Sequence, residues 1–204
     1  KYQIKEGVGK KKALNKKQLK AIANYSDGNK FTEFYRDLWL FIYFCNGINV
    51  ADLINLKFSD IQNGEISFIR EKTKDRTRDT KRIYAPITPE MQSIIEKWGN
   101  NPRKSIYIFP FMKAGDDAWE HEKKKKNLTK HINDRMKVIG EKLNIGKITT
   151  YVARHTYATV LRNEGVPVSI ISPMLGHTSI TTTEIYLADL ESENRARNAS
   201  LLSF

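Results

Sequence analysis

The most constraining feature of the sequence is an uninterrupted run of eight apolar residues, Leu38–Cys45. A membrane-spanning helix needs roughly 20 apolar residues, so this run is too short to cross a bilayer. The pattern predicts a helix over Glu33–Cys45, capped by Thr32 and ended by Asn46-Gly47. Because this helix is apolar on every side after Asp37, it must lie deep in a core. The run therefore predicts a folded domain built around one buried helix.

Helical spacing of apolar residues recurs along most of the chain. Further helices are predicted over Asn15–Asn24 (with an Asn15/Gln18 capping box), a short stretch capped by Asn49, Pro89–Trp98, Leu128–Leu143, Thr150–Asn163, Val168–Leu175, Thr181–Leu187 and Leu190–Leu202. Alternation over Ile66–Lys72, resumed in Arg82–Ile87, predicts a β-hairpin with a long polar tip. Tyr107–Phe109 is expected as a third strand and Lys113–Lys126 as a loop. The fold class is mainly α (α+β), a helical bundle with a small antiparallel sheet, which argues against a doubly wound sheet.

The charge balance restricts the partners. Lys and Arg number 35 against 23 Asp and Glu, which gives a formal net charge of +12. Such an excess favours a polyanion, either nucleic acid or an anionic membrane surface, although a merely well-solvated basic surface is the simpler alternative. The single cysteine, Cys45, excludes a disulfide within the chain and a zinc site built from several cysteines. The N-terminus lacks the apolar segment of a secretory signal, so we expect an intracellular protein.

The residues that can carry chemistry are concentrated in Thr149–Asp189. This stretch contains YVAR at 151–154, LGH at 175–177 and Tyr186 nine residues after the histidine. Upstream lie FCNGINVADLINLKFSDI and FIREKT. In this order and spacing, the four pieces resemble the catalytic half of the tyrosine recombinase (phage integrase) family, in the integrase branch of conjugative or mobilisable transposons. The resemblance covers about Asn15 to Leu190.

The resemblance implies a fold, a reaction and partners. We expect residues 14–204 to form the catalytic domain, and residues 1–13 to be a linker or tail from a missing N-terminal DNA-binding domain. The family cleaves and rejoins DNA strands through a 3′-phosphotyrosyl intermediate, without metal, ATP or another cofactor, to integrate or excise a mobile element. The expected partners are double-stranded DNA at recombination sites, three further copies in a homo-tetramer, and accessory DNA-bending proteins. No membrane is involved, and the bacterial cytoplasm is the expected location.

The resemblance also assigns roles to residues. Tyr186 is the expected nucleophile, because a phenol can store the energy of the broken phosphodiester as a covalent ester. Arg154 matches the second of the family's two arginines, whose planar guanidinium can hold two phosphate oxygens. His177 is expected to donate a hydrogen bond to the phosphate. Lys72 matches the general acid for the leaving 5′-hydroxyl, with Lys74 as a rival. DNA contacts are expected from Lys74, Arg76 and Arg78, which lie within Arg70–Arg82, a stretch of net charge +4. His155 is a further candidate DNA contact, with a buried structural role as the alternative.

Two positions depart from the family pattern. Asn49 stands where the family has its first arginine, and Asn cannot supply a cation. Arg70 is the first candidate to replace it, because strand alternation puts it on the same face as Lys72; Arg36 is the second. Tyr151 replaces the histidine of HxxR and is expected to hydrogen-bond the phosphate or orient Arg154, since a phenol is a poor base at neutral pH.

Two alternative functions remain open from the sequence. A type IB topoisomerase-like enzyme would use related chemistry to relax supercoils, and a non-catalytic DNA-binding module would account for the departures at Asn49 and Tyr151. Covalent capture of DNA separates the module from either enzyme, and plasmid relaxation separates the two enzymes.

Overall fold

The computed structural model describes residues 12–71 and 81–187, apart from the side chain of Tyr186. The helices in this part of the chain are α1 Lys16–Ala23, α2 Lys30–Phe44, α3 Val50–Leu53, α4 Pro89–Trp98, α5 Ala118–Lys142, α6 Thr150–Asn163, α7 Val168–Met174 and α8 Ile180–Leu187, with a 3₁₀ turn at Phe58–Asp60. The strands β1 Ile61–Gln62, β2 Glu65–Ile69 and β3 Arg82–Pro86 form one antiparallel sheet in the order β1-β2-β3. The predicted fold class is therefore confirmed.

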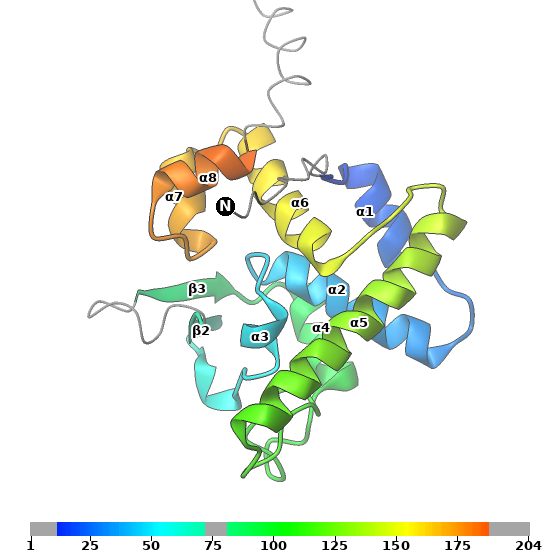
Figure 1. Ribbon diagram of the computed structural model, residues 1–204, viewed down its shortest axis with the longest axis vertical. Coiled ribbons are helices and arrows are strands. Elements are labelled where there is room, and N and C mark those ends of the chain that lie inside the picture. Colours follow the sequence, from blue (N-terminus) through cyan, green and yellow to red (C-terminus); the bar gives the residue numbers. More distant parts are fainter. Residues whose placement is uncertain (1–11, 72–80, 188–204) are drawn as a thin grey trace, which may run out of the picture.

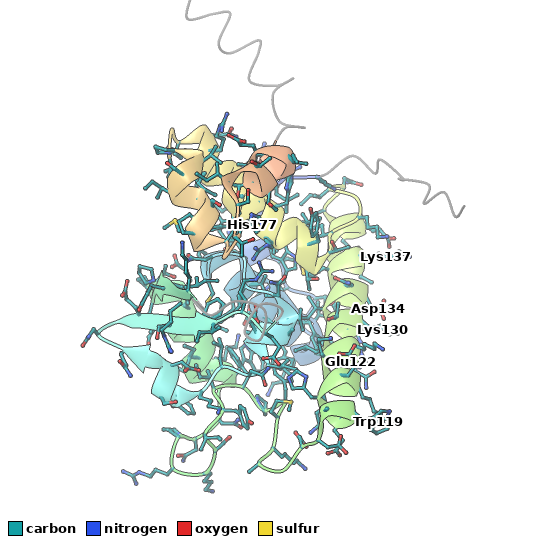
Figure 2. The ribbon with its side chains drawn as sticks, turned by 60° about the vertical axis from the view of Figure 1, so that its left-hand side comes forward. Trp119, Glu122, Lys130, Asp134, Lys137 and His177 are labelled. Carbon is teal, nitrogen blue, oxygen red and sulfur yellow. The ribbon has the colours of Figure 1, made fainter. Side chains whose placement is uncertain are left out.

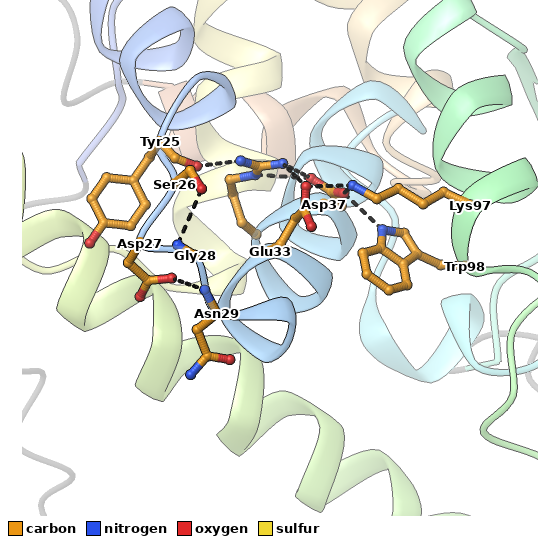
Figure 3. A network of polar contacts seen from close by, with 10 residues as sticks. Tyr25, Ser26, Asp27, Gly28, Asn29, Glu33, Asp37, Lys97 and Trp98 are labelled. Carbon is orange, nitrogen blue, oxygen red and sulfur yellow. Dashed lines mark hydrogen bonds and ion pairs between the residues drawn. The ribbon is translucent and has the colours of Figure 1, made fainter.

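Helix α2 is the centre of the core, as its apolar run predicts. Trp39 and Phe41 have no exposed surface, and α1, α4, α5 and α6 all pack against this helix. Asp37, also on α2, is buried but accepts hydrogen bonds from Trp98 Nε1 at 2.8 Å and Lys97 Nζ at 3.3 Å, which fasten α4 to α2 (Figure 3). The helix begins earlier than expected, because Asn29 and not Thr32 caps it through the Phe31 amide.

The sheet and α5 lie on opposite sides of α2, and α7 and α8 lie at one end of the molecule (Figure 1). A second, small apolar cluster lies under that end and consists of Ala158 on α6, Ile171 on α7, and Leu175 and Leu187. Because α6 contributes Val152 and Ala153 to the main core and Ala158 to the small cluster, it joins the two.

Two sequence expectations in the middle of the chain are wrong. The segment expected as a loop up to Lys126 becomes helix from Ala118, because Asp117 and Glu120 form a capping box and α5 then runs 25 residues. The third strand is Ile61–Gln62 and not Tyr107–Phe109; Tyr107 makes a single β-bridge with Lys57.

The helix expected over Leu190–Leu202 lies outside the described residues. In the described part of the chain, every helix is either too short or too polar to traverse a lipid bilayer.

Candidate active site

Arg154 is the central cation of the candidate site. It lies on α6 with 7% of its surface exposed. Its Nη1 donates a hydrogen bond to the Gly47 carbonyl at 2.8 Å, and its Nη2 donates to the Leu175 carbonyl and lies 3.3 Å from His177 Nε2. These contacts come from the turn after α2 and from the end of α7. The guanidinium is thus fixed by backbone groups that are distant in sequence, which orients its planar fork before any substrate arrives.

Arg70, which follows β2, reaches the turn at the end of α7 that also binds Arg154. Its Nη1 donates to the Gly176 carbonyl at 2.8 Å, next to the Leu175 carbonyl that Arg154 uses. Gly176 has φ +64°, and a Cβ there would come within 2.4 Å of Arg70 Cδ. Only glycine therefore allows Arg70 this approach. The structure brings Arg70 beside Arg154 and His177, where the sequence predicts a substitute for the absent arginine.

Arg36, the second candidate for that substitution, is engaged elsewhere. Its Nε and Nη2 donate to the Asp37 carboxylate at 2.9 and 2.6 Å, and its Nη1 donates to the Tyr25 carbonyl. It lines a groove between α1, α2 and α4 and forms ion pairs with Glu33 and Asp37. These partners argue against a role for Arg36 at the Arg154 site.

His177 follows the short helix α7 and lies between α7, α8 and the sheet (Figure 2). Its Nδ1 is 2.8 Å from Thr183 Oγ1 on α8. Partial burial, with Arg154 and Arg70 nearby, lowers the pKa of His177 to about 4. The imidazole is therefore neutral at neutral pH, so it can take part as a hydrogen-bonding group and not as a third cation.

Asp52 is a residue of the site that sequence reasoning missed. It is buried on α3, and its Oδ1 accepts the backbone N–H of Glu71 at 2.7 Å, immediately beyond Arg70. Burial raises the pKa of Asp52, while the Glu71 amide, Arg70 and Arg154 act in the opposite direction. From the sequence, Asp52 is only an acidic residue in the first turn of a helix, where it interacts favourably with the helix dipole. Its contact with the Glu71 backbone depends on tertiary packing.

Asn49 occupies the N-cap position of α3 but does not cap it with its side chain. Its Nδ2 instead lies 3.4 Å from Asp52 Oδ2. The expected capping bond is therefore absent among the described contacts of this helix. Asn49 also lines a small cavity of about 100 Å³ with Ile48, Val50, Thr150, Tyr151 and Arg154.

Tyr151 lies at the edge of the site. It is 48% exposed in the first turn of α6, and its ring is nearly parallel to that of His155, at 8° with centroids 6.2 Å apart. His155 itself has no exposed surface, because the position after Arg154 turns into the core. This burial contradicts the expected DNA contact of His155, which is a structural residue beneath Tyr151.

Tyr186 belongs to α8, which is anchored beside His177 by the Thr183 contact and by the buried Leu187. Lys72, Lys74, Arg76 and Arg78 lie outside the described residues, so their expected roles stay predictions. Within the described residues, no group of three His, Cys, Asp or Glu side chains is arranged to hold a metal ion.

Comparisons with known proteins agree on one family. The model of the phage integrase family matches residues 12–193. The tyrosine recombinase XerA of Pyrococcus furiosus is 28% identical over 86% of this chain and 56% of its own length.

Two solved structures have the same fold. XerH recombinase bound to a palindromic difH substrate in a post-cleavage complex has a TM-score of 0.66, with 16% identity over 95% of this chain and 54% of that chain. The Tn1549 transposon integrase in complex with a circular intermediate DNA has a TM-score of 0.57, with 18% identity over 95% and 68%. The chain spans about half the length of the curated relatives it matches. The family match covers most of the sequence and includes the residues that converge on Arg154, and the chain therefore belongs to the phage integrase family.

Proposed function

We propose that this chain is the catalytic domain of a site-specific DNA recombinase that breaks and rejoins strands through a covalent bond between Tyr186 and a 3′-phosphate. The observation that carries the proposal is the convergence of Arg154, Arg70 and His177 on one turn, Leu175–His177, from which α8 leads to Tyr186. Two fixed guanidinium groups and a neutral imidazole suit a phosphate whose negative charge grows in the transition state.

The proposed reaction is a transesterification. The Tyr186 oxygen attacks phosphorus and forms the Tyr–phosphate bond while the bond from phosphorus to the 5′-oxygen breaks. The phenol gives its proton to water, and the leaving 5′-oxygen takes one from Lys72. Arg154 and Arg70 neutralise the negative charge on the non-bridging oxygens. Arg70 supplies the positive charge that is absent at Asn49. Attack by a 5′-hydroxyl from another strand reverses the step and joins new partners.

The biological setting is a further part of the proposal. The Tn1549 neighbour is a transposon integrase, which supports integration or excision of a mobile element. The XerH neighbour is bound to its DNA substrate, which supports double-stranded recombination sites as the partner. We propose a homo-tetramer on DNA, assisted by accessory DNA-bending proteins, in the bacterial cytoplasm. Residues 14–204 would be one domain of a longer recombinase, in keeping with the greater length of the relatives.

The test uses nicked duplexes that lose a short strand on cleavage and so trap the covalent adduct. A pool of candidate crossover sites is incubated with the wild-type chain, with Tyr186→Phe, and with Tyr84→Phe as a control that removes an exposed phenol on β3. The proposal predicts an SDS-resistant, protease-sensitive adduct with wild type and Tyr84→Phe, and none with Tyr186→Phe.

Three results would count against the proposal. An adduct that persists in Tyr186→Phe would assign the nucleophile to another residue. No adduct from DNA that is demonstrably bound would favour a DNA-binding module. Relaxation of a supercoiled plasmid without joining of two DNAs would favour a topoisomerase.

A further inference from the structure

Thr183 is a buried polar residue that faces the candidate site from α8. Its neighbours Thr181 and Thr182 are exposed, whereas Thr183 has no exposed surface. Its Oγ1 lies 2.8 Å from His177 Nδ1. Thr183 precedes Tyr186 by three residues, which is just under one helical turn. The contact therefore links the imidazole to the helix that carries the proposed nucleophile.

The surroundings of His177 determine which ring nitrogen carries the proton. Nε2 lies 3.3 Å from Arg154 Nη2, and a guanidinium can donate a hydrogen bond but cannot accept one. Nε2 must then be the acceptor, and the proton resides on Nδ1, which donates to Thr183 Oγ1. Because the pKa of His177 is about 4, the ring is neutral at pH 7 and carries a single proton, so the two tautomers are distinct states.

The strand-transfer reaction needs the other tautomer. To donate a hydrogen bond to a phosphate oxygen, His177 must carry its proton on Nε2, and Nδ1 must then accept. A carboxylate or a carbonyl next to Nδ1 could only accept and would lock the first tautomer. The hydroxyl of Thr183 can accept in one state and donate in the other, so it satisfies Nδ1 in both.

We propose that Thr183 is a positioning residue that holds His177 through Nδ1 and lets the ring proton change from Nδ1 to Nε2 when a DNA phosphate replaces the imidazole as a partner of Arg154. The second half of this inference rests on the proposed function. In the exchange, Nδ1 gives one proton to water and Nε2 takes one from water, so the ring stays neutral and no bond between heavy atoms changes.

The first experiment measures the tautomer in the DNA-free chain by ¹⁵N NMR of labelled histidines, with the His177 signals assigned from their loss in His177→Gln. The proposal predicts protonated Nδ1 in wild type, in Thr183→Ser, which keeps the hydroxyl, and in the exposed control Thr182→Val. Thr183→Val leaves Arg154 facing Nε2 but removes the acceptor of the Nδ1–H, so it should weaken this preference. A wild-type proton on Nε2, or an unchanged pattern in Thr183→Val, would overturn the proposal. If Thr183→Val fails to fold, Thr183→Ala is the hydroxyl-free variant to measure, and the wild-type spectrum alone still tests the tautomer.

The second experiment asks whether the tautomer changes on DNA. Tyr186→Phe is bound to the duplex that wild type cleaves, and the proposal predicts that the His177 proton is then on Nε2. Retention of the proton on Nδ1 in the bound complex contradicts the exchange.

Cleavage rates give a matched readout. With saturating DNA, we expect Thr183→Val to form adduct about 10–100-fold more slowly, by analogy with the loss seen when hydrogen-bond partners of metal-binding histidines are removed. Thr183→Ser and Thr182→Val should keep the wild-type rate; equal rates for Thr183→Val and Thr182→Val would contradict a positioning role. If no DNA is cleaved by wild type, the proposed function fails, while the NMR of the free chain still decides what Thr183 does to His177.

Discussion

At the scale of single residues, the candidate site depends on guanidinium groups fixed by main-chain carbonyls. Arg70 and Arg154 donate to the neighbouring carbonyls of Gly176 and Leu175, and Arg154 also donates to Gly47. A planar fork with several donors can hold such acceptors and still present further N–H groups to a phosphate. A lysine is a single point charge on a flexible stem and cannot make this arrangement.

Replacement of Arg70 tests whether it supplies the charge absent at Asn49. We expect Arg70→Ala to lower the rate of adduct formation about 10²–10³-fold at saturating DNA, the usual loss for one donor to a developing oxyanion. Arg70→Lys should recover only part of this loss, because the charge remains without the fork. Arg82→Ala removes an equal charge from β3, where Arg82 donates to Ser67, and is the control. Equal losses in Arg70→Ala and Arg82→Ala would mean that Arg70 acts only through general charge.

His177 predicts a specific pH dependence of stability. Its pKa falls from 6.5 to about 4 on folding, so the unfolded chain binds an extra proton below about pH 6.5 while the folded chain stays neutral. Above about pH 6.5, His177 is neutral in both the folded and the unfolded chain and does not change the free energy of unfolding. As the pH drops from 6.5 toward 4, the unfolded chain takes up the proton and the free energy of unfolding falls. Urea unfolding of wild type and His177→Gln between pH 7 and 4 measures this. The variant should lose less stability on acidification, and parallel curves would contradict a lowered pKa.

At the scale of elements, the helices with a strong apolar pattern or a clear capping motif can be predicted from the sequence. The capping box at Asn15 and Gln18 and the buried run of α2 are both confirmed. Helix α5 was only half predicted, because its first turns are lysine-rich and lack an apolar stripe. They are stabilised instead by the Asp117 cap and by ion pairs of Glu122 with Lys125 and Lys126. The Asp117/Glu120 spacing was the available signal.

The turn between α2 and α3 carries a second element-scale prediction. Gly47 has φ +63°, and a Cβ there would lie 2.8 Å from Arg154 Cα and Cγ. Gly28 has φ +74° with nothing within 4 Å, so Gly28→Ala should cost only about 1–2 kcal/mol for the left-handed backbone. Gly47→Ala should cost about 1–3 kcal/mol more, the usual penalty of overpacking, and should displace Arg154. Denaturation of both variants measures the difference, and equal losses would contradict a close approach at Gly47.

At the scale of the whole molecule, the site is assembled where the main core meets the small cluster under α7 and α8. Arg154 and His177 could be chosen from the sequence because their motifs resemble a family. Arg70 was chosen on strand alternation, but β2 ends at Ile69, and the contact with the Gly176 carbonyl is what places Arg70 beside them. Asp52 and Thr183 could not be chosen, because their contacts join segments whose relative position only the packed fold determines. Whether His155 is buried or exposed also depends on that packing.

The charge of the whole chain predicts how DNA binding responds to salt. With a net charge of +12, binding should be driven largely by the release of counterions. We expect the affinity of Tyr186→Phe for duplex DNA to fall about 10³-fold between about 50 and about 200 mM salt, as for roughly six phosphate contacts. Fluorescence anisotropy across that range gives the slope, and an affinity independent of salt would contradict electrostatic binding.

Peptide mapping of the trapped protein–DNA adduct by mass spectrometry identifies the residue that attacks the DNA. If Tyr186 is the nucleophile, the peptide that contains it carries a nucleotide attached through its 3′-phosphate, and the released strand has a free 5′-hydroxyl. Attachment to another residue, or a 5′-phosphate on the protein, would contradict the proposed reaction.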